Sequence, residues 1–236
     1  IRDRLQAVVG SWAASLNGQA APVLDVQTRT RFNEANDSHY YLVPGVIVTI
    51  MTMIGALLTS LVMAREYERG TLESLFVTPV GSGEILTAKA ATNFLLGMVS
   101  LAISMIFAAF VFDIPIRGSL ILLLAVSALF LIVALGLGLV ISTATKNQFL
   151  ACQFAIMGTF MPALMLSGFL YDILNMPPAV RAITYIIPAR YYVTLLQTLF
   201  LAGDIPSVII PCCITLGVFA VVLMGIARLK APKSLE

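Results

Sequence analysis

Five long stretches without a single Asp, Glu, Lys or Arg limit what this chain can fold into more than any other feature. A helix needs about 20 predominantly apolar residues to cross the hydrocarbon core of a bilayer, which is about 30 Å thick. All five stretches reach that length, and they are residues 40–63, 90–112, 118–145, 147–171 and 205–227. A soluble protein can bury one such helix but hardly five. The sequence therefore predicts an all-α membrane protein, a helical bundle with five transmembrane helices.

The overall composition supports this prediction and excludes several other classes. Hydrophobic residues make up 59% of the chain and charged residues 11%, which is far from an ordinary soluble domain. A transmembrane β-barrel would need alternating apolar and polar positions, whereas these stretches are apolar throughout. The net charge of +2 is too small to indicate a nucleic-acid partner.

Enzymatic chemistry is not indicated by any residue pattern. The three cysteines lie inside apolar stretches and the chain has one histidine, so we expect no metal site. The sequence has no G-x-x-x-x-G-K-[ST] loop that would cradle nucleotide phosphates. We therefore expect no catalytic residue and no cofactor bound to this chain.

Positive charges are distributed unevenly between the ends of the five stretches. If the stretches alternate in direction, one side of the membrane carries Arg65, Arg69, Lys89, Lys146, Arg228, Lys230 and Lys233. The other side carries Arg117, Arg181 and Arg190. The positive-inside rule makes the first side cytoplasmic. We therefore expect residues 1–39 to be the end of an extracytoplasmic domain and residues 229–236 to be a cytoplasmic tail. Since no signal peptide or earlier span would deliver residues 1–39 outside, we also expect a preceding part with one more span.

Residues 64–79 form a charged segment between the first two stretches, and they are compatible with an amphipathic cytoplasmic helix. Oppositely charged residues three or four positions apart, such as Glu66 and Arg69, would support this helix by a few tenths of a kcal/mol per pair. Gly70 would weaken it by about 1 kcal/mol relative to Ala, so a kink or a two-part helix is compatible with the sequence. Such a helix could present its carboxylates to a soluble partner, or it could be only a solvated connector.

Residues 172–204 form an outer segment that is apolar but interrupted by prolines and charges. Its longest uncharged run would extend only about 20 Å as a helix, which is too short to span a bilayer. We therefore expect two short outer re-entrant helices. Arg190 should snorkel to the outer interface while Tyr191 and Tyr192 anchor there. With Pro188, these residues could form a mobile gate over a cavity or a rigid plug, and the sequence leaves both open.

The charged segment resembles a known motif almost residue for residue. Its pattern R-E-x-E-x-G-T-x-E-x-L-x-V-T-P is similar to the intracellular motif of type-2 ABC transporter permeases of the bacterial drug-exporter kind. The motif positions are occupied by Arg65, Glu66, Glu68, Gly70, Thr71, Glu73, Leu75, Val77, Thr78 and Pro79. The similarity extends to residues 42–45 and to the outer segment, where Ile187 and Pro188 precede two tyrosines.

This resemblance implies a permease of six membrane helices in a bacterial inner membrane. The charged segment would be the coupling helix that contacts a separate ABC ATPase subunit, which would carry ATP and Mg. The contact residues would be Arg65, Glu66, Glu68, Arg69, Gly70, Thr71, Glu73 and Pro79. A second permease would complete a homo- or heterodimer, and a periplasmic adaptor protein is a further partner that the resemblance allows.

The expected function is that of a membrane-spanning permease subunit of an ATP-driven ABC exporter, associated with efflux and drug resistance. It would move a hydrophobic or amphiphilic substrate out of the cytoplasm or the inner leaflet. The alternative is a secondary transporter or channel that is not coupled to ATP. An ion-coupled carrier should show acidic residues within its spans or inverted repeats, and the sequence shows neither.

Overall fold

The computed structural model describes residues 39–70, 82–112, 114, 117–171 and 173–230, and every structural statement below refers to these residues. All described residues belong to one compact unit. The predictions made for residues 1–38, for the second half of the charged segment and for the last six residues lie outside the described part.

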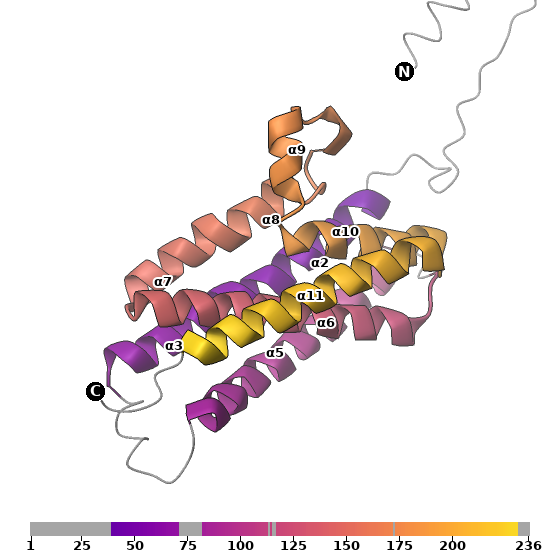
Figure 1. Cartoon of the computed structure of the whole chain (residues 1–236). Coiled ribbons are helices and arrows are strands. Elements are labelled where there is room, and N and C mark those ends of the chain that lie inside the picture. The colour runs from indigo at the N-terminus through magenta and orange to yellow at the C-terminus, as the bar shows by residue number, and fades with distance from the viewer. Residues whose placement is uncertain (1–38, 71–81, 113, 115–116, 172, 231–236) are drawn as a thin grey trace, which may run out of the picture. The chain divides into compact units, whose positions relative to one another are not determined.

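Long helices account for most of the described residues (Figure 1). The first long helix runs without a break through α2 (His39–Thr52), the π-helical turn η1 (Met53–Leu58) and α3 (Thr59–Glu68). The second and third are α5 (Ser82–Phe110) and α6 (Leu120–Thr145). The fourth consists of α7 (Gln148–Ala155), the π-helical turn η2 (Ile156–Phe160) and α8 (Met161–Leu166). The fifth is α11 (Pro206–Lys230).

Four short elements follow α8 and precede α11. They are the 3₁₀ turn η3 (Ile173–Asn175), α9 (Pro178–Thr184), α10 (Pro188–Gln197) and the π-helical turn η4 (Thr198–Ala202). No strand occurs in the described part of the chain. The predicted all-α fold is therefore confirmed.

Each long helix contains a segment that is long and apolar enough to cross a membrane. Within the described residues these five segments are Leu42–Glu68, Thr87–Phe110, Leu120–Thr145, Gln148–Leu166 and Pro206–Leu229. The prediction of five transmembrane helices is confirmed on these grounds of length and composition.

Several helix ends differ from the ends of the uncharged stretches, and the first and fourth helices are two examples. The first helix continues past Met63 through the charged residues to Glu68. The fourth helix ends at Leu166, although its uncharged stretch runs to Tyr171. A turn follows it because Gly168 has a φ of +90°, which a residue with a side chain rarely adopts. Absence of charge therefore marks where a span can lie, not where its helix ends.

α6 lies at the centre of this bundle. It packs against η1, α3, α5, α7, α10 and α11. Its buried residues include Phe130, Leu131, Val133 and Ala134, which follow one another closely and so point to different sides. A helix that is apolar on all sides is typical of a buried position, so α6 positions the other helices around it.

Glycines allow the first long helix to approach α6 closely at two points. A Cβ atom added at Gly55 would lie 2.4 Å from the Cβ of Ala134, and one added at Gly138 would lie 2.7 Å from the carbonyl oxygen of Ala56. Small residues at such crossings let helix backbones come together in a membrane. By contrast, a Cβ added at Gly158 would meet nothing within 4 Å.

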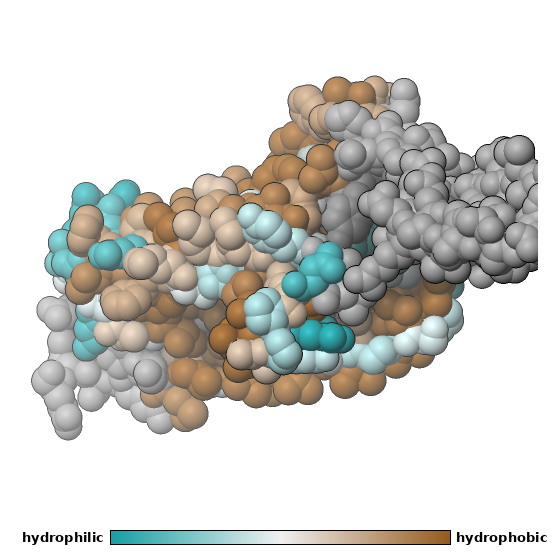
Figure 2. Space-filling model, turned by 90° about the horizontal axis from the view of Figure 1, so that it is seen from above, coloured by the Kyte–Doolittle hydropathy of each residue, from teal (hydrophilic) through white to brown (hydrophobic). Residues whose placement is uncertain are grey.

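The outward faces of the bundle are largely apolar. Exposed large hydrophobic side chains occur along α5, along α7–α8 and along α11, including Phe107, Phe154 and Val221. Figure 2 shows hydrophobic residues over much of one face, with hydrophilic residues at the end where α3 ends and α7 begins and in a second group near the middle of the view. This pattern fits helices whose sides face hydrocarbon and whose charged end faces water.

Candidate functional site

The charged segment begins as a direct continuation of the first membrane helix. Arg65, Glu66 and Glu68 belong to the last turns of α3, and the backbone N–H of Arg69 donates to the carbonyl of Arg65 over 3.0 Å. Gly70 then has a φ of +67°, a left-handed conformation that favours glycine. The helix therefore ends before Gly70. Thr71, Glu73 and Pro79, the other predicted contact residues, lie outside the described residues.

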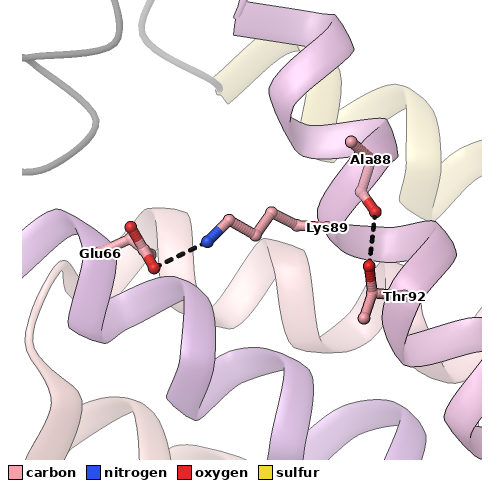
Figure 3. Close-up of polar contacts among 4 residues, drawn as sticks. All are labelled: Glu66, Ala88, Lys89 and Thr92. Carbon is pink, nitrogen blue, oxygen red and sulfur yellow. Dashed lines mark hydrogen bonds and ion pairs between the residues drawn. The ribbon is translucent and has the colours of Figure 1, made fainter.

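Glu66 is tied to the second long helix. Lys89 Nζ of α5 lies 2.7 Å from Glu66 Oε1, and the exposed fractions of the two side chains are 34% and 23% (Figure 3). Next to this pair, Thr92 Oγ1 donates to the carbonyl oxygen of Ala88 within α5. The ion pair is partly accessible to water, so we expect it to contribute no more than about 1 kcal/mol. It nevertheless joins the helices on either side of the charged segment.

Glu68 is tied to the fourth long helix. The backbone N–H of Gln148, the first residue of α7, donates to Glu68 Oε2 over 2.9 Å. Arg65 Nε donates to the side-chain oxygen Oε1 of the same glutamine over 3.3 Å. The side chain of Asn147 caps α7 by accepting from the N–H of Leu150 at 3.1 Å. A carboxylate at a helix N-terminus is favourable because the N–H groups there carry partial positive charge.

The contacts of the charged side chains differ from the pairs that the sequence suggested. The sequence suggested pairs within one helix, such as Arg65 with Glu68, whereas the structure shows both residues in contact with Gln148. Asn147 followed by a helical pattern is a recognisable capping signal. The carboxylate that reaches this helix from 80 positions earlier in the chain has no such signal, because only the packing of α3 against α7 brings them together.

A buried polar contact lies further along the same helices. Asn93 Nδ2 of α5 donates to Thr59 Oγ1 of α3 over 3.0 Å, and both residues are buried. A hydrogen bond between membrane helices is worth about 1 kcal/mol, so this contact adds to the tie made by Lys89 and Glu66.

An apolar groove lies between the first, third and fourth long helices and the outer segment. Its volume is about 320 Å³, and its walls include Thr52 of α2, Phe130 of α6, Thr159 of η2 and Pro188 of α10. The hydroxyls of the two threonines donate to carbonyls of their own helices, at Val48 and Ala155. The groove therefore offers mainly hydrocarbon surface to whatever enters it.

The outer segment contains the two predicted short helices, and they differ in burial. α9 is mostly exposed, whereas α10 packs against α2, α6 and α11. Pro188 begins α10 and lines the groove. The guanidinium of Arg190 donates to Thr184 Oγ1 and lies 4.0 Å from the centre of the Tyr185 ring. Arg190 is therefore held against the end of α9 by both contacts.

The two tyrosines of α10 have different surroundings. Tyr191 is half-buried and donates its hydroxyl to the carbonyl of Tyr185 over 3.0 Å. Tyr192 is 0% exposed, donates to Ser127 Oγ over 2.8 Å and stacks on Phe130 with ring centres 4.1 Å apart. The expectation that both tyrosines anchor at the interface is therefore wrong for Tyr192. Neighbouring residues of a helix point about 100° apart, so only one of them can face α6. A gating role for Pro188, Arg190 and the tyrosines stays a prediction.

Comparisons with known proteins agree with the family resemblance of the charged segment. Residues 13–201 match the family described as ABC-2 type transporter. The chain is 48% identical over 221 residues to the "Probable multidrug ABC transporter permease YbhS" of Escherichia coli strain K12, and the match covers 93% of this chain and 59% of that protein.

Two further relatives from the same strain are more distant. The chain is 30% identical over 202 residues to the "Probable multidrug ABC transporter permease YbhR", covering 84% of this chain and 54% of that protein. It is 28% identical to the "Inner membrane transport permease YhhJ", a match that covers 100% of this chain and 63% of that protein. The chain thus spans between 54% and 63% of the length of these curated relatives. It belongs to the ABC-2 type transporter family, the type-2 ABC permeases whose motif its charged segment resembles.

Proposed function

We propose that this chain is the membrane-spanning permease part of an ATP-driven ABC exporter and that it moves a hydrophobic or amphiphilic substrate out of the cytoplasm or the inner leaflet. Its family and the names of its relatives, two of which are called multidrug permeases, support this class of function. The proposal extends beyond them to the substrate class, the direction of transport and the coupling to ATP.

The observation that carries the proposal is the apolar groove. It is bordered by three of the long helices and by the outer segment, so its walls come from elements that lie far apart in the sequence. Burial of apolar surface is favourable by about 25 cal/mol per Å², so this lining suits a ligand that is itself largely apolar. Since the threonine hydroxyls of the lining bond to their own helices, they add little selectivity. Such a lining fits a permease that accepts several apolar compounds.

The charged end of the bundle is the proposed contact with a separate ABC ATPase subunit. Arg65, Glu68 and Arg69 are exposed there, and Glu66 is half-buried against Lys89. ATP and Mg would bind to that subunit, so this chain would contribute no catalytic residue. Two permease chains, identical or different, would assemble with two ATPases, and a periplasmic adaptor protein is a further proposed partner.

The same end is proposed to face the cytoplasm of a bacterial cell, across its inner membrane. Arg65, Lys89, Lys146 and Arg228 lie at the ends of helices that meet on this side, and the positive-inside rule favours the cytoplasm for it. The segment before α2 would then be extracytoplasmic and the end of α11 cytoplasmic.

Reconstitution with a candidate ABC ATPase tests this proposal. The full-length protein should copurify with the ATPase, and inside-out vesicles containing both should accumulate a fluorescent apolar dye when ATP and Mg are added. An ATPase variant that binds but does not hydrolyse ATP is the control, and it should abolish accumulation. Dye movement that proceeds equally with this variant would favour the alternative, a secondary transporter or channel.

A further inference from the structure

We propose that Glu68 and Gln148 form a mechanical joint that transmits movement of the charged segment to the helix lining the apolar groove; this inference rests on the proposed function. Glu68 lies two residues before Gly70, at the end of the described part of the charged segment. Gln148 is the first residue of the fourth long helix. Their hydrogen bond, 2.9 Å long, connects the two directly.

Two hydrogen bonds make up the joint, and both involve Gln148. The carboxylate of Glu68 accepts from the backbone N–H of Gln148, and the guanidinium of Arg65 donates to the side-chain oxygen of Gln148. A charge-assisted hydrogen bond is stronger than one between neutral groups. A displacement of the end of α3 would therefore pull or push the first turn of α7.

The helices that meet at this joint also meet beside the groove. α3 packs against α7, the two π-helical turns η1 and η2 pack against each other, and α2 packs against α8. Thr52, which immediately precedes η1, lies in the wall of the groove, as do Gly158 and Thr159 of η2. π-helical turns within α-helices frequently occur at functional sites. Movement at the joint thus has a continuous helical path to both sides of the groove.

One substitution can break the joint without altering the charged segment. Gln148→Pro removes the N–H that Glu68 accepts from, and it also removes the side chain that Arg65 contacts. Proline is favourable at the first position of a helix, where the N–H has no partner within the helix. The preceding residue must have an extended conformation, and Asn147 already has φ −135° and ψ 130°. The variant should therefore fold.

Gln148→Ala is the matched control because it keeps the N–H bond to Glu68. Both variants would be compared with the wild-type protein in the full permease–ATPase complex, reconstituted in vesicles. We expect Gln148→Pro to reduce dye transport and dye-stimulated ATP hydrolysis about tenfold, the equivalent of one charge-assisted hydrogen bond of about 1.4 kcal/mol. Copurification with the ATPase and basal ATP hydrolysis should be unchanged. Gln148→Ala should stay within about twofold of wild type, since the charge-assisted bond remains.

Distances across the groove give a readout that a purely structural role would not change. Spin labels at Thr52→Cys and Thr159→Cys, introduced into a chain without Cys152, Cys212 and Cys213, should report a change in distance when ATP and Mg are added to the otherwise wild-type complex. We expect this change to disappear in Gln148→Pro. If Gln148→Pro accumulates poorly, Glu68→Ala breaks the same bond from the other side. Since Glu68 also belongs to the proposed ATPase contact, this variant is measured only in complexes isolated with the ATPase bound, and these should lose the distance change.

Several results would overturn the joint. Transport by Gln148→Pro at the wild-type rate would do so. An ATP-dependent distance change as large in Gln148→Pro as in the wild-type complex would also do so. Equal losses in Gln148→Pro and Gln148→Ala would show that the N–H bond to Glu68 is not the connection. Loss of ATPase binding in either variant would instead make this region a contact surface. Failure of the wild-type protein to bind an ATPase or to transport with ATP would count against the proposed function, so the two failures are distinguishable.

Discussion

Lys89 Nζ of α5 lies 2.7 Å from Glu66 Oε1 of α3, so a carboxylate of the proposed ATPase contact also binds within its own chain. The pair joins the two helices between which the charged segment runs. A loss of function after substitution of Glu66 would therefore have two explanations, a lost partner contact or a loosened bundle. A charge exchange between the two residues separates them.

We expect Glu66→Lys to lower the free energy of unfolding by about 1 kcal/mol, because it places two ammonium groups side by side. Lys89→Glu should cost a similar amount, and the double exchange should restore most of the stability. Thermal unfolding in detergent measures this, and copurification measures ATPase binding. If Glu66 also contacts the ATPase, the double exchange should recover stability but not binding. A single Glu66→Lys variant that unfolds like wild type would contradict the role of the ion pair.

The hydrogen bond from Tyr192 to Ser127 should stabilise the position of α10 on α6. Tyr192→Phe keeps the ring stacked on Phe130 but removes the hydroxyl, and we expect it to cost about 1–2 kcal/mol. Ser127→Ala should cost a similar amount because it leaves a buried hydroxyl without this partner. The double variant should cost less than the sum of the single variants, as measured by chemical or thermal unfolding. Strict additivity would mean that the two groups do not interact.

Gly138→Ala should destabilise the contact between α6 and the first long helix. The added Cβ would lie 2.7 Å from a backbone oxygen, which cannot rotate away as a side chain can. Overpacking of this kind costs about 1–3 kcal/mol. Gly217→Ala on α11 is the control, because its Cβ would meet nothing within 4 Å, and it should unfold at or slightly above the wild-type temperature. Equal melting temperatures for the two variants would argue against close packing at Gly138.

Gly158→Leu should fill part of the groove while leaving the fold intact. Its Cβ has open space, and the residue lines the groove. We expect ATP-dependent dye transport to fall severalfold while thermal stability stays near wild type, since leucine favours a helix by up to about 1 kcal/mol over glycine. Gly217→Leu adds the same side chain to α11 away from the groove, and it should transport normally. Normal transport by Gly158→Leu would mean that substrates do not use this groove.

The proposed orientation can be checked by labelling single cysteines in a variant without Cys152, Cys212 and Cys213. An impermeant thiol reagent added to intact cells should label cysteines placed at Asn175 and Asp204, which are exposed in the outer segment. Cysteines placed at Lys146 and Arg228 are also exposed, but they should react only after the cells are broken. Labelling of position 228 from outside would show that α11 has the opposite orientation to the one proposed.

The sequence by itself determined the membrane architecture and the family. Five uncharged stretches predict five crossing helices, because a charge within hydrocarbon is costly and the length of a span follows from the thickness of the bilayer. The charged motif between the first two stretches indicated the permease family that residues 13–201 match. The short outer helices were also predictable, since their uncharged run is too short to cross.

Only the tertiary structure decided which partner each polar residue has. Glu68 meets Gln148 across 80 positions, and Tyr192 meets Ser127 across 65, because α6 and its neighbours pack in one particular rotation. Helices that are apolar on all sides have no polar face from which that rotation could be read. Close approaches of small residues, such as Gly55 to Ala134, select the rotation of each helix instead. They therefore also determine where the groove lies, because its walls come from helices distant in sequence.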